Sequence, residues 1–137
     1  MQILVIDGQG GGIGKSIIEV IKKECTGIEI IAVGTNTTAT ATMMKAGADM
    51  YATGENAVVV SARRADIILG PIGILAADSL LGEITPKMAI AVSRSPARKI
   101  LIPINKCNYF VAGVRYENME GLIVSAVDIL KTLLEGR

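Results

Sequence analysis

The chain has 137 residues, half of them hydrophobic, and its 14 lysines and arginines nearly balance 13 aspartates and glutamates, for a formal charge of +1. A chain of this size can bury a core without disulfides, and like charges never run longer than pairs such as Arg63 and Arg64. These features exclude the electrostatic footprint of a nucleic-acid binder and predict one domain over residues 1–137.

The chain begins with two predicted strand–helix units. A short apolar strand at residues 2–7 precedes a helix whose apolar residues recur at helical spacing from Ile13. A second buried strand, at residues 28–33, precedes a helix of small residues with Asn36 or Thr37 as its N-cap. Glycines are concentrated at the first of these strand–helix junctions.

Two further units follow. Residues 50–52 predict a short strand and residues 57–64 a helix, although the β-branched run AVVV within that helix also suits a strand. Residues 66–69 predict a fourth strand, which the sequence GPIG ends. After it, ILAADSLLGE predicts one helix and residues 86–95 predict another, with Thr85 as its cap and Pro86 in its first turn.

The C-terminal part predicts two strands, at residues 99–104 and 109–114, and a closing helix at residues 119–134. The polar loop NKCNY separates the two strands, which suits an antiparallel pair. Strands that alternate with helices at this spacing predict an α/β fold, a three-layer sandwich with a mainly parallel sheet.

The closing helix carries apolar residues around more of its surface than one sheet face covers. They are Leu122, Ile123, Ala126, Val127, Ile129, Leu130, Leu133 and Leu134. We therefore expect a homo-oligomer contact on this helix.

The loop between the first strand and the first helix holds five glycines within seven residues. They are Gly8, Gly10, Gly11, Gly12 and Gly14. Each ordered glycine costs about 0.5–1 kcal/mol relative to alanine. Helix packing alone does not require five, whereas phosphate oxygens can approach a glycine backbone closely at a helix N-terminus.

The spacing Gly8-x-x-x-Gly12-Ile13-Gly14 resembles the cofactor loop of the short-chain dehydrogenase/reductase family, with Asp7 in place of that family's threonine. The resemblance implies a Rossmann-like fold that binds NAD(P), and the turn from Gly70 to Gly73 resembles that family's turn after its fourth strand. The catalytic Tyr-x-x-x-Lys pair of the family is absent, so dehydrogenase activity does not carry over.

Three alternatives to an NAD site stay open. The end of the predicted second strand has no acid for a ribose, and its Thr35, Asn36 and Thr37 either accept a 2′-phosphate, as in NADP, or only cap the next helix. Lys15 and Ser16 resemble the end of the deviant Walker loop of partition-type ATPases, where they would contact phosphate and Mg²⁺. A structural oligomer without any ligand is the third alternative.

Two further groups of polar residues contain side chains of the kinds that bind substrates or transfer protons. The loop residues Asn105, Lys106, Cys107 and Asn108 follow a predicted strand, where substrate-side groups of α/β proteins gather, although a solvated hairpin explains them equally well. Asp78, Glu83 and Lys87 are interpreted as capping or solvated residues rather than an acid/base group. No residue is assigned a catalytic role.

The composition of the chain bears on its expected cellular location and on whether it binds a metal. The start MQILVID lacks a basic leader, and no apolar run approaches the roughly 18 residues of a membrane span, so we expect a cytoplasmic protein without a membrane partner. Histidine is absent, and Cys25 and Cys107 do not form a spaced pair, so we expect no metal site.

The segments VIDGQGGGIGK, GPIGILAADSLLGEITP and KILIPINKC resemble, over nearly the full length, a bacterial family of short Rossmann-like proteins that has no established activity. We expect a small phosphate-bearing ligand, NAD(P) or another nucleotide. The predicted binding residues are Asp7, Gly8, Gly10, Gly11, Gly12, Ile13, Gly14, Lys15, Ser16, Thr35, Asn36, Thr37, Gly70 and Gly73.

Overall fold

The computed structural model describes residues 1–104, 109–114 and 118–136. Its sheet has the strand order β3-β2-β1-β4-β5, and every neighbouring pair is parallel. The strands are β1 (Ile3–Asp7), β2 (Ile30–Gly34), β3 (Met50–Thr53), β4 (Ile67–Pro71) and β5 (Arg98–Ile102). The mainly parallel α/β architecture predicted from the sequence is therefore confirmed.

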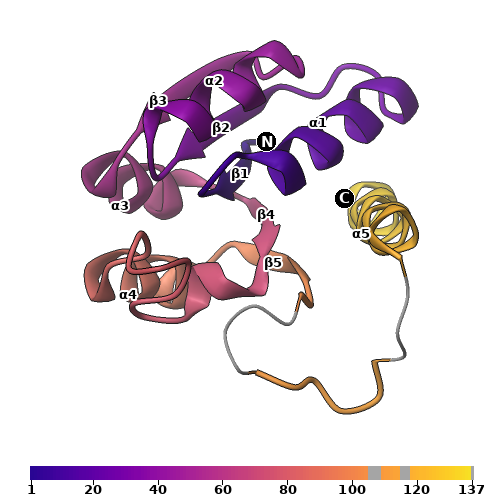
Figure 1. The fold of residues 1–137 in the computed structure, drawn as a ribbon. Coiled ribbons are helices and arrows are strands. Elements are labelled where there is room, and N and C mark those ends of the chain that lie inside the picture. The colour runs from indigo at the N-terminus through magenta and orange to yellow at the C-terminus, as the bar shows by residue number, and fades with distance from the viewer. Residues whose placement is uncertain (105–108, 115–117, 137) are drawn as a thin grey trace.

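Helices cover both faces of this sheet (Figure 1). They are α1 (Gly12–Glu24), α2 (Thr37–Lys45), α3 (Glu55–Arg64), α4 (Pro86–Arg94) and α5 (Met119–Glu135), with a short 3₁₀ helix, η1 (Ile72–Leu75), after β4. Alternate residues of β1 explain the two layers: Ile3 and Val5 pack with α1, α2 and α5, whereas Leu4 and Ile6 pack with α3 and α4. The result is a three-layer sandwich.

The strand order places a topological switch between β1 and β4. From β1 the chain proceeds outward through β2 to β3, then crosses back to pair β4 with the other edge of β1, in the register Ile3 to Ile67. The helices that follow β1 and β4 leave on opposite faces of the sheet. A crevice is expected at the carboxyl ends of strands at such a point.

Several local predictions are confirmed. Asn36 caps α2, its Oδ1 accepting from the Ala39 amide at 2.8 Å, and Thr85 caps α4, its Oγ1 accepting from the Met88 amide at 3.2 Å. The ambiguous AVVV run is helical and lies within α3. There Val58 is fully buried in the core, so tertiary packing decides against the local β propensity.

The helix predicted over ILAADSLLGE is wrong. Only η1 forms at its start, and the chain then turns repeatedly with positive φ at Asp78 (65°), Leu80 (54°) and Leu81 (55°). Left-handed residues cannot continue a right-handed helix. Hydrogen bonds within the turn, such as Asp78 N–H to the Ile84 carbonyl at 2.7 Å, take the place of helical ones.

The strand predicted at residues 109–114, and with it the antiparallel pair, is also wrong. These residues form no strand, and a hydrogen bond from Val114 N–H to the Val111 carbonyl closes a turn among them. The segment adds no strand to the described sheet, and Phe110 is 84% exposed. Without a neighbouring strand, aromatic and β-branched residues do not suffice to form a strand.

Among the described residues, every helix is too short or too polar to cross a bilayer.

Candidate functional site

A crevice of about 190 Å³ lies at the carboxyl ends of β1 and β4, at the topological switch. The glycine loop after β1 forms one wall, from Asp7 to Ile13, and Pro71 at the end of β4 contributes to the opposite one. Leu80, Ile104 and Met119 complete the lining with apolar side chains. The predicted glycine loop therefore lines a crevice that is open to solvent, with Gly10 and Gly12 exposed in it.

Asp7 shapes this loop from beneath. The side chain is 4% exposed; its Oδ1 accepts from the Gly8 amide at 2.8 Å and its Oδ2 from the Gly14 amide at 2.7 Å. A carboxylate here also interacts favourably with the positive end of the α1 dipole. Asp7, predicted as a ligand-binding residue, thus fixes the path of the loop through two backbone donors.

Three glycines of the loop are required by the fold itself. A Cβ on Gly8 would lie 2.7 Å from the Thr35 hydroxyl oxygen, and one on Gly14 would lie 2.5 Å from the Met43 sulfur. Gly11 has φ of 76° and would place a Cβ 2.8 Å from the Ala39 carbonyl oxygen. Any larger residue would separate the loop from β2 and α2.

Gly10 and Gly12 have no such requirement. A Cβ on either would meet no atom within 4 Å, and neither residue has a positive φ. Both line the crevice. Since neither packing nor backbone conformation explains these two glycines, the space that they leave open is available to a ligand.

Backbone donors at the start of α1 face the same region. In the described part of the chain, the N–H groups of Gly12 and Ile13 have no hydrogen-bond acceptor, as is usual for a first helical turn. Lys15, the residue after Gly14 in α1, is exposed to solvent. The hydroxyl of Ser16 donates to the Gly12 carbonyl at 3.0 Å, so it is already engaged within the helix.

Glu83 joins the glycine loop to the end of β2. Its Oε1 accepts from the Gln9 amide at 3.0 Å, from the Thr35 hydroxyl at 2.6 Å and from the Asn36 side-chain amide at 2.6 Å. Burial raises the pKa of Glu83, but these three hydrogen bonds outweigh it, so its pKa lies below the ordinary value. The interpretation of Glu83 as a solvated or capping residue is therefore wrong, because its carboxylate joins two segments of the fold.

Two of the three residues after β2 therefore make hydrogen bonds that stabilise the fold. Thr35 donates to Glu83, and Asn36 both caps α2 and donates to the Gln9 carbonyl at 2.9 Å. Thr37 is exposed in the first turn of α2. Of the three residues predicted at this place, only Thr37 has a side chain without a hydrogen bond to the described residues.

Of the two glycines predicted to follow the fourth strand, Gly70 lies within β4 and Gly73 within η1, and neither lines the crevice. A Cβ on Gly70 would collide with the Ile6 carbonyl, so this glycine allows β4 to pack against β1. The Gly73 carbonyl accepts from the Ser79 hydroxyl. Pro71, between them, lines the crevice. Pro71 belongs to the turn from Gly70 to Gly73 that the sequence singled out, although only its two glycines were named as binding residues.

The substrate-side residues Asn105, Lys106, Cys107 and Asn108 lie outside the described residues. Their neighbour Ile104 lines the crevice. Among the residues that are described, no three acidic or cysteine side chains gather as a metal-binding group.

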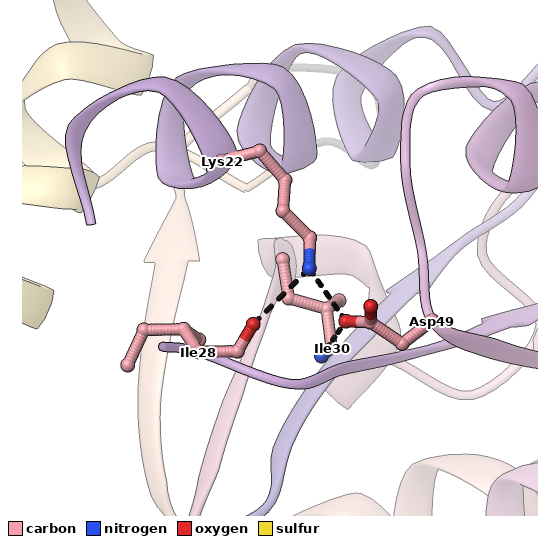
Figure 2. A network of polar contacts seen from close by, with 4 residues as sticks. All are labelled: Lys22, Ile28, Ile30 and Asp49. Atoms are coloured by element: carbon pink, nitrogen blue, oxygen red, sulfur yellow. Dashed lines mark hydrogen bonds and ion pairs between the residues drawn. The ribbon is translucent and has the colours of Figure 1, made fainter. Parts of the chain in front are cut away.

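A second polar network lies at the opposite, amino-terminal edge of the sheet (Figure 2). Lys22 Nζ donates to Asp49 Oδ2 at 2.5 Å and to the Ile28 carbonyl at 3.1 Å, and Asp49 Oδ2 also accepts from the Ile30 amide at 2.7 Å. These bonds tie the end of α1 to the starts of β2 and β3. The network joins structural elements and lines no part of the crevice.

Comparison with known proteins yields one family and several similar folds. A family model described as a domain of unknown function (DUF3842) matches residues 2–135. No curated protein matches the chain.

Similar solved structures include a dodecameric FMN-dependent UbiX-like decarboxylase from Escherichia coli O157:H7, at 18% identity and TM-score 0.49 over 96% of this chain and 76% of that one. A probable oxidoreductase from Mycobacterium abscessus has 22% identity and TM-score 0.47 over 75% of this chain and 30% of that one. AibC has 17% identity and TM-score 0.52 over 92% of this chain and 34% of that one, which indicates a shared fold.

Proposed function

Because the chain belongs to the DUF3842 family, whose description names no activity, we propose a function from the geometry of the crevice: it binds the phosphates of a nucleotide, most simply a dinucleotide of the NAD(P) type. The observation that carries this proposal is the open space at Gly10 and Gly12. These two glycines line the crevice, yet neither the packing nor the backbone conformation of the fold requires glycine at these positions.

The donors around this space suit a phosphate group. The Gly12 and Ile13 amides begin α1 with no acceptor among the described residues, and they carry the partial positive charge of the helix. The Gly14 amide already donates to the Asp7 carboxylate, so a phosphate could accept hydrogen bonds from two amides of the first turn rather than three. Lys15, exposed in the same turn, supplies the compensating positive charge.

The sheet order supports a dinucleotide over a Walker-type nucleotide site. The order β3-β2-β1-β4-β5 is that of the dinucleotide-binding fold up to its fifth strand, and the crevice lies where that fold binds the pyrophosphate. In the Walker interpretation Ser16 would hold Mg²⁺. Its hydroxyl instead donates to the Gly12 carbonyl, which weakens that alternative.

The test compares ligand binding with stability in three glycine variants. Thermal unfolding of the wild type is measured with NAD, NADP, ATP with Mg²⁺, and pyrophosphate. A ligand at 100 times its Kd raises the free energy of unfolding by about 2.7 kcal/mol. We expect a dinucleotide to give such a shift, and Gly12→Asp to abolish it while unfolding, without ligand, near the wild-type temperature.

Matched glycine variants separate binding from folding. Gly10→Ala enters open space, so we expect weaker ligand binding at nearly unchanged stability. Gly14→Ala collides with Met43 and Asp7 and should lower stability by about 1–3 kcal/mol, as overpacking does. If neither dinucleotide shifts the wild type, the proposal is wrong; a shift with Mg²⁺-ATP alone would favour the Walker alternative.

A further inference from the structure

The end of β2 determines which ribose a dinucleotide-binding sheet accepts. In that fold an acidic residue after the second strand binds the 2′-hydroxyl of the adenosine ribose, whereas a nearby arginine accommodates a 2′-phosphate. In this chain β2 ends at Gly34 and is followed by Thr35, Asn36 and Thr37, none of which is acidic. From the sequence alone, this position favours a phosphorylated ribose over a plain one.

The fold reverses this expectation because it brings a carboxylate to the position from another segment. Glu83 lies between η1 and α4, 48 residues after Thr35, and its Oε1 is 2.6 Å from the Thr35 hydroxyl and 2.6 Å from the Asn36 side-chain nitrogen. It also contacts the Gln9 amide in the glycine loop. The carboxylate thus lies between the glycine loop and the end of β2. In a bound ADP-ribose group, the phosphates would contact the loop and the ribose would contact the end of β2.

One oxygen of the Glu83 carboxylate accepts three hydrogen bonds, and the other is available to accept one from a ligand. The hydrogen bonds from Gln9, Thr35 and Asn36 all end on Oε1, and Oε2 has no partner among the described residues. The three donors hold the carboxylate in place, so Oε2 is a preorganised acceptor. A ribose hydroxyl is a donor of the matching kind.

Among the described residues, no ion pair with a lysine or arginine offsets the Glu83 carboxylate at the end of β2. Residues 34–44 contain no lysine or arginine, and the ion pairs of the described chain involve Lys22 with Asp49 and Lys131 with Glu24, not Glu83. The hydrogen bonds to Glu83 outweigh the effect of burial and hold its pKa below the usual range, so it is ionised at neutral pH. A 2′-phosphate would therefore meet an uncompensated negative charge.

We propose that Glu83 selects dinucleotides with an unmodified adenosine ribose, the NAD class, and rejects the 2′-phosphorylated NADP class. This inference rests on the dinucleotide function proposed above and adds a specificity-determining residue to it. Oε2 accepts a hydrogen bond from the ribose diol, and its charge repels a phosphate at the same position.

Isothermal titration of NAD and NADP against the wild type and Glu83→Gln tests the assignment. Glutamine keeps an oxygen that can take the three donors of Oε1, and replaces the free Oε2 by an uncharged NH₂ group. We expect the wild type to bind NAD at least about tenfold tighter than NADP, a difference of about 1.4 kcal/mol. In Glu83→Gln the ratio should fall close to one.

Glu19→Gln is the matched control, because Glu19 is exposed on α1 and undergoes the same change of charge. It should keep the wild-type ratio. Wild type that binds both dinucleotides equally, or NADP more tightly, overturns the ribose assignment and leaves the proposed function standing. An unchanged ratio in Glu83→Gln also overturns it. If neither dinucleotide binds the wild type, both proposals are wrong.

Discussion

The single oxygen Oε1 of Glu83 holds together segments that are far apart in the sequence. It accepts from Gln9 in the glycine loop and from Thr35 and Asn36 beyond β2. Hydrogen bonds to a charged acceptor are stronger than neutral ones. The protonation of one side chain is therefore coupled to the order of the crevice wall.

This coupling predicts a pH dependence of stability. The folded-state pKa of Glu83 lies below the ordinary glutamate value of 4.5, so its stabilisation is complete above the unfolded pKa and is lost as the pH falls through the folded one. We expect wild type to be more stable than Glu83→Gln at pH 7, with the difference shrinking once the pH falls below 4.5. Urea unfolding at a series of pH values measures both free energies.

Glu19→Gln again serves as the control, because it removes one carboxylate charge from an exposed position on α1. If Glu83→Gln instead differs from wild type by the same amount at every pH, its hydrogen bonds do not depend on the charge of the carboxylate.

At the scale of elements, the network at the amino-terminal edge of the sheet determines how α1 and β3 are fixed to β2. Asp49 Oδ2 accepts from both Lys22 Nζ and the Ile30 amide. The hydrogen bond from Lys22, followed by that from Ile30, lowers the pKa of Asp49. The Asp49 side chain is 41% exposed, so water screens the charge interaction more than the backbone bond.

Two substitutions of Asp49 separate these contributions. Asp49→Asn keeps an acceptor for the Ile30 amide and should cost less than about 1 kcal/mol, as exposed ion pairs do. Asp49→Ala leaves that amide unpaired and should cost about 1–2 kcal/mol. Chemical denaturation at pH 7 measures both values. Equal losses in the two variants would mean that the ion pair, rather than the backbone bond, carries the stabilisation.

The sequence predicted elements well where local signals agree with packing. Thr85 and, as one of two candidates with Thr37, Asn36 are predictable as caps because a cap requires only its own side chain and the next turn. The segment that contains Asp78 and Leu80 was mispredicted because its turns depend on contacts such as the Leu80 side chain against Gly8.

The candidate site was predicted in part for the same reason. The glycine loop has a local pattern, and the two amides that Asp7 accepts from, those of Gly8 and Gly14, lie within that loop. The use of Glu83, in contrast, depends on partners at distant positions in the sequence. The approach of Glu83 to Thr35 joins residues 48 positions apart, and no periodicity or motif reports such a contact. The distinction between Gly10, which is open, and Gly8, which is closely packed, likewise needed the three-dimensional fold.

At the scale of the whole molecule, the outer surface of α5 bears on assembly. Ile123, Ala126, Val127 and Leu130 are buried against the sheet, whereas Ile129 remains 48% exposed. The sheet therefore covers part of the wide apolar stripe predicted for this helix. The homo-oligomer expected from that stripe stays a prediction.

Light scattering during size-exclusion chromatography tests the expected oligomer. If α5 carries the contact, Ile129→Asp should reduce the mass in solution to that of one chain, while the exposed position keeps the cost to folding small. Ile90→Asp on α4 is a matched control, because Ile90 is also 48% exposed. A wild-type protein that is already monomeric contradicts the prediction, as does an equal effect of both variants.

The central place of β1 also has a consequence for synthesis on the ribosome. β1 can pair with β2 as soon as Gly34 has emerged, but its other edge is completed by β4, whose pairing with Ile3 begins at Ile67. Until then the nascent chain exposes an apolar strand edge, the kind of surface that promotes aggregation. The second half of the polypeptide thus protects the first, and a ribosome that stalls before Pro71 would release a chain whose central strand has an open edge.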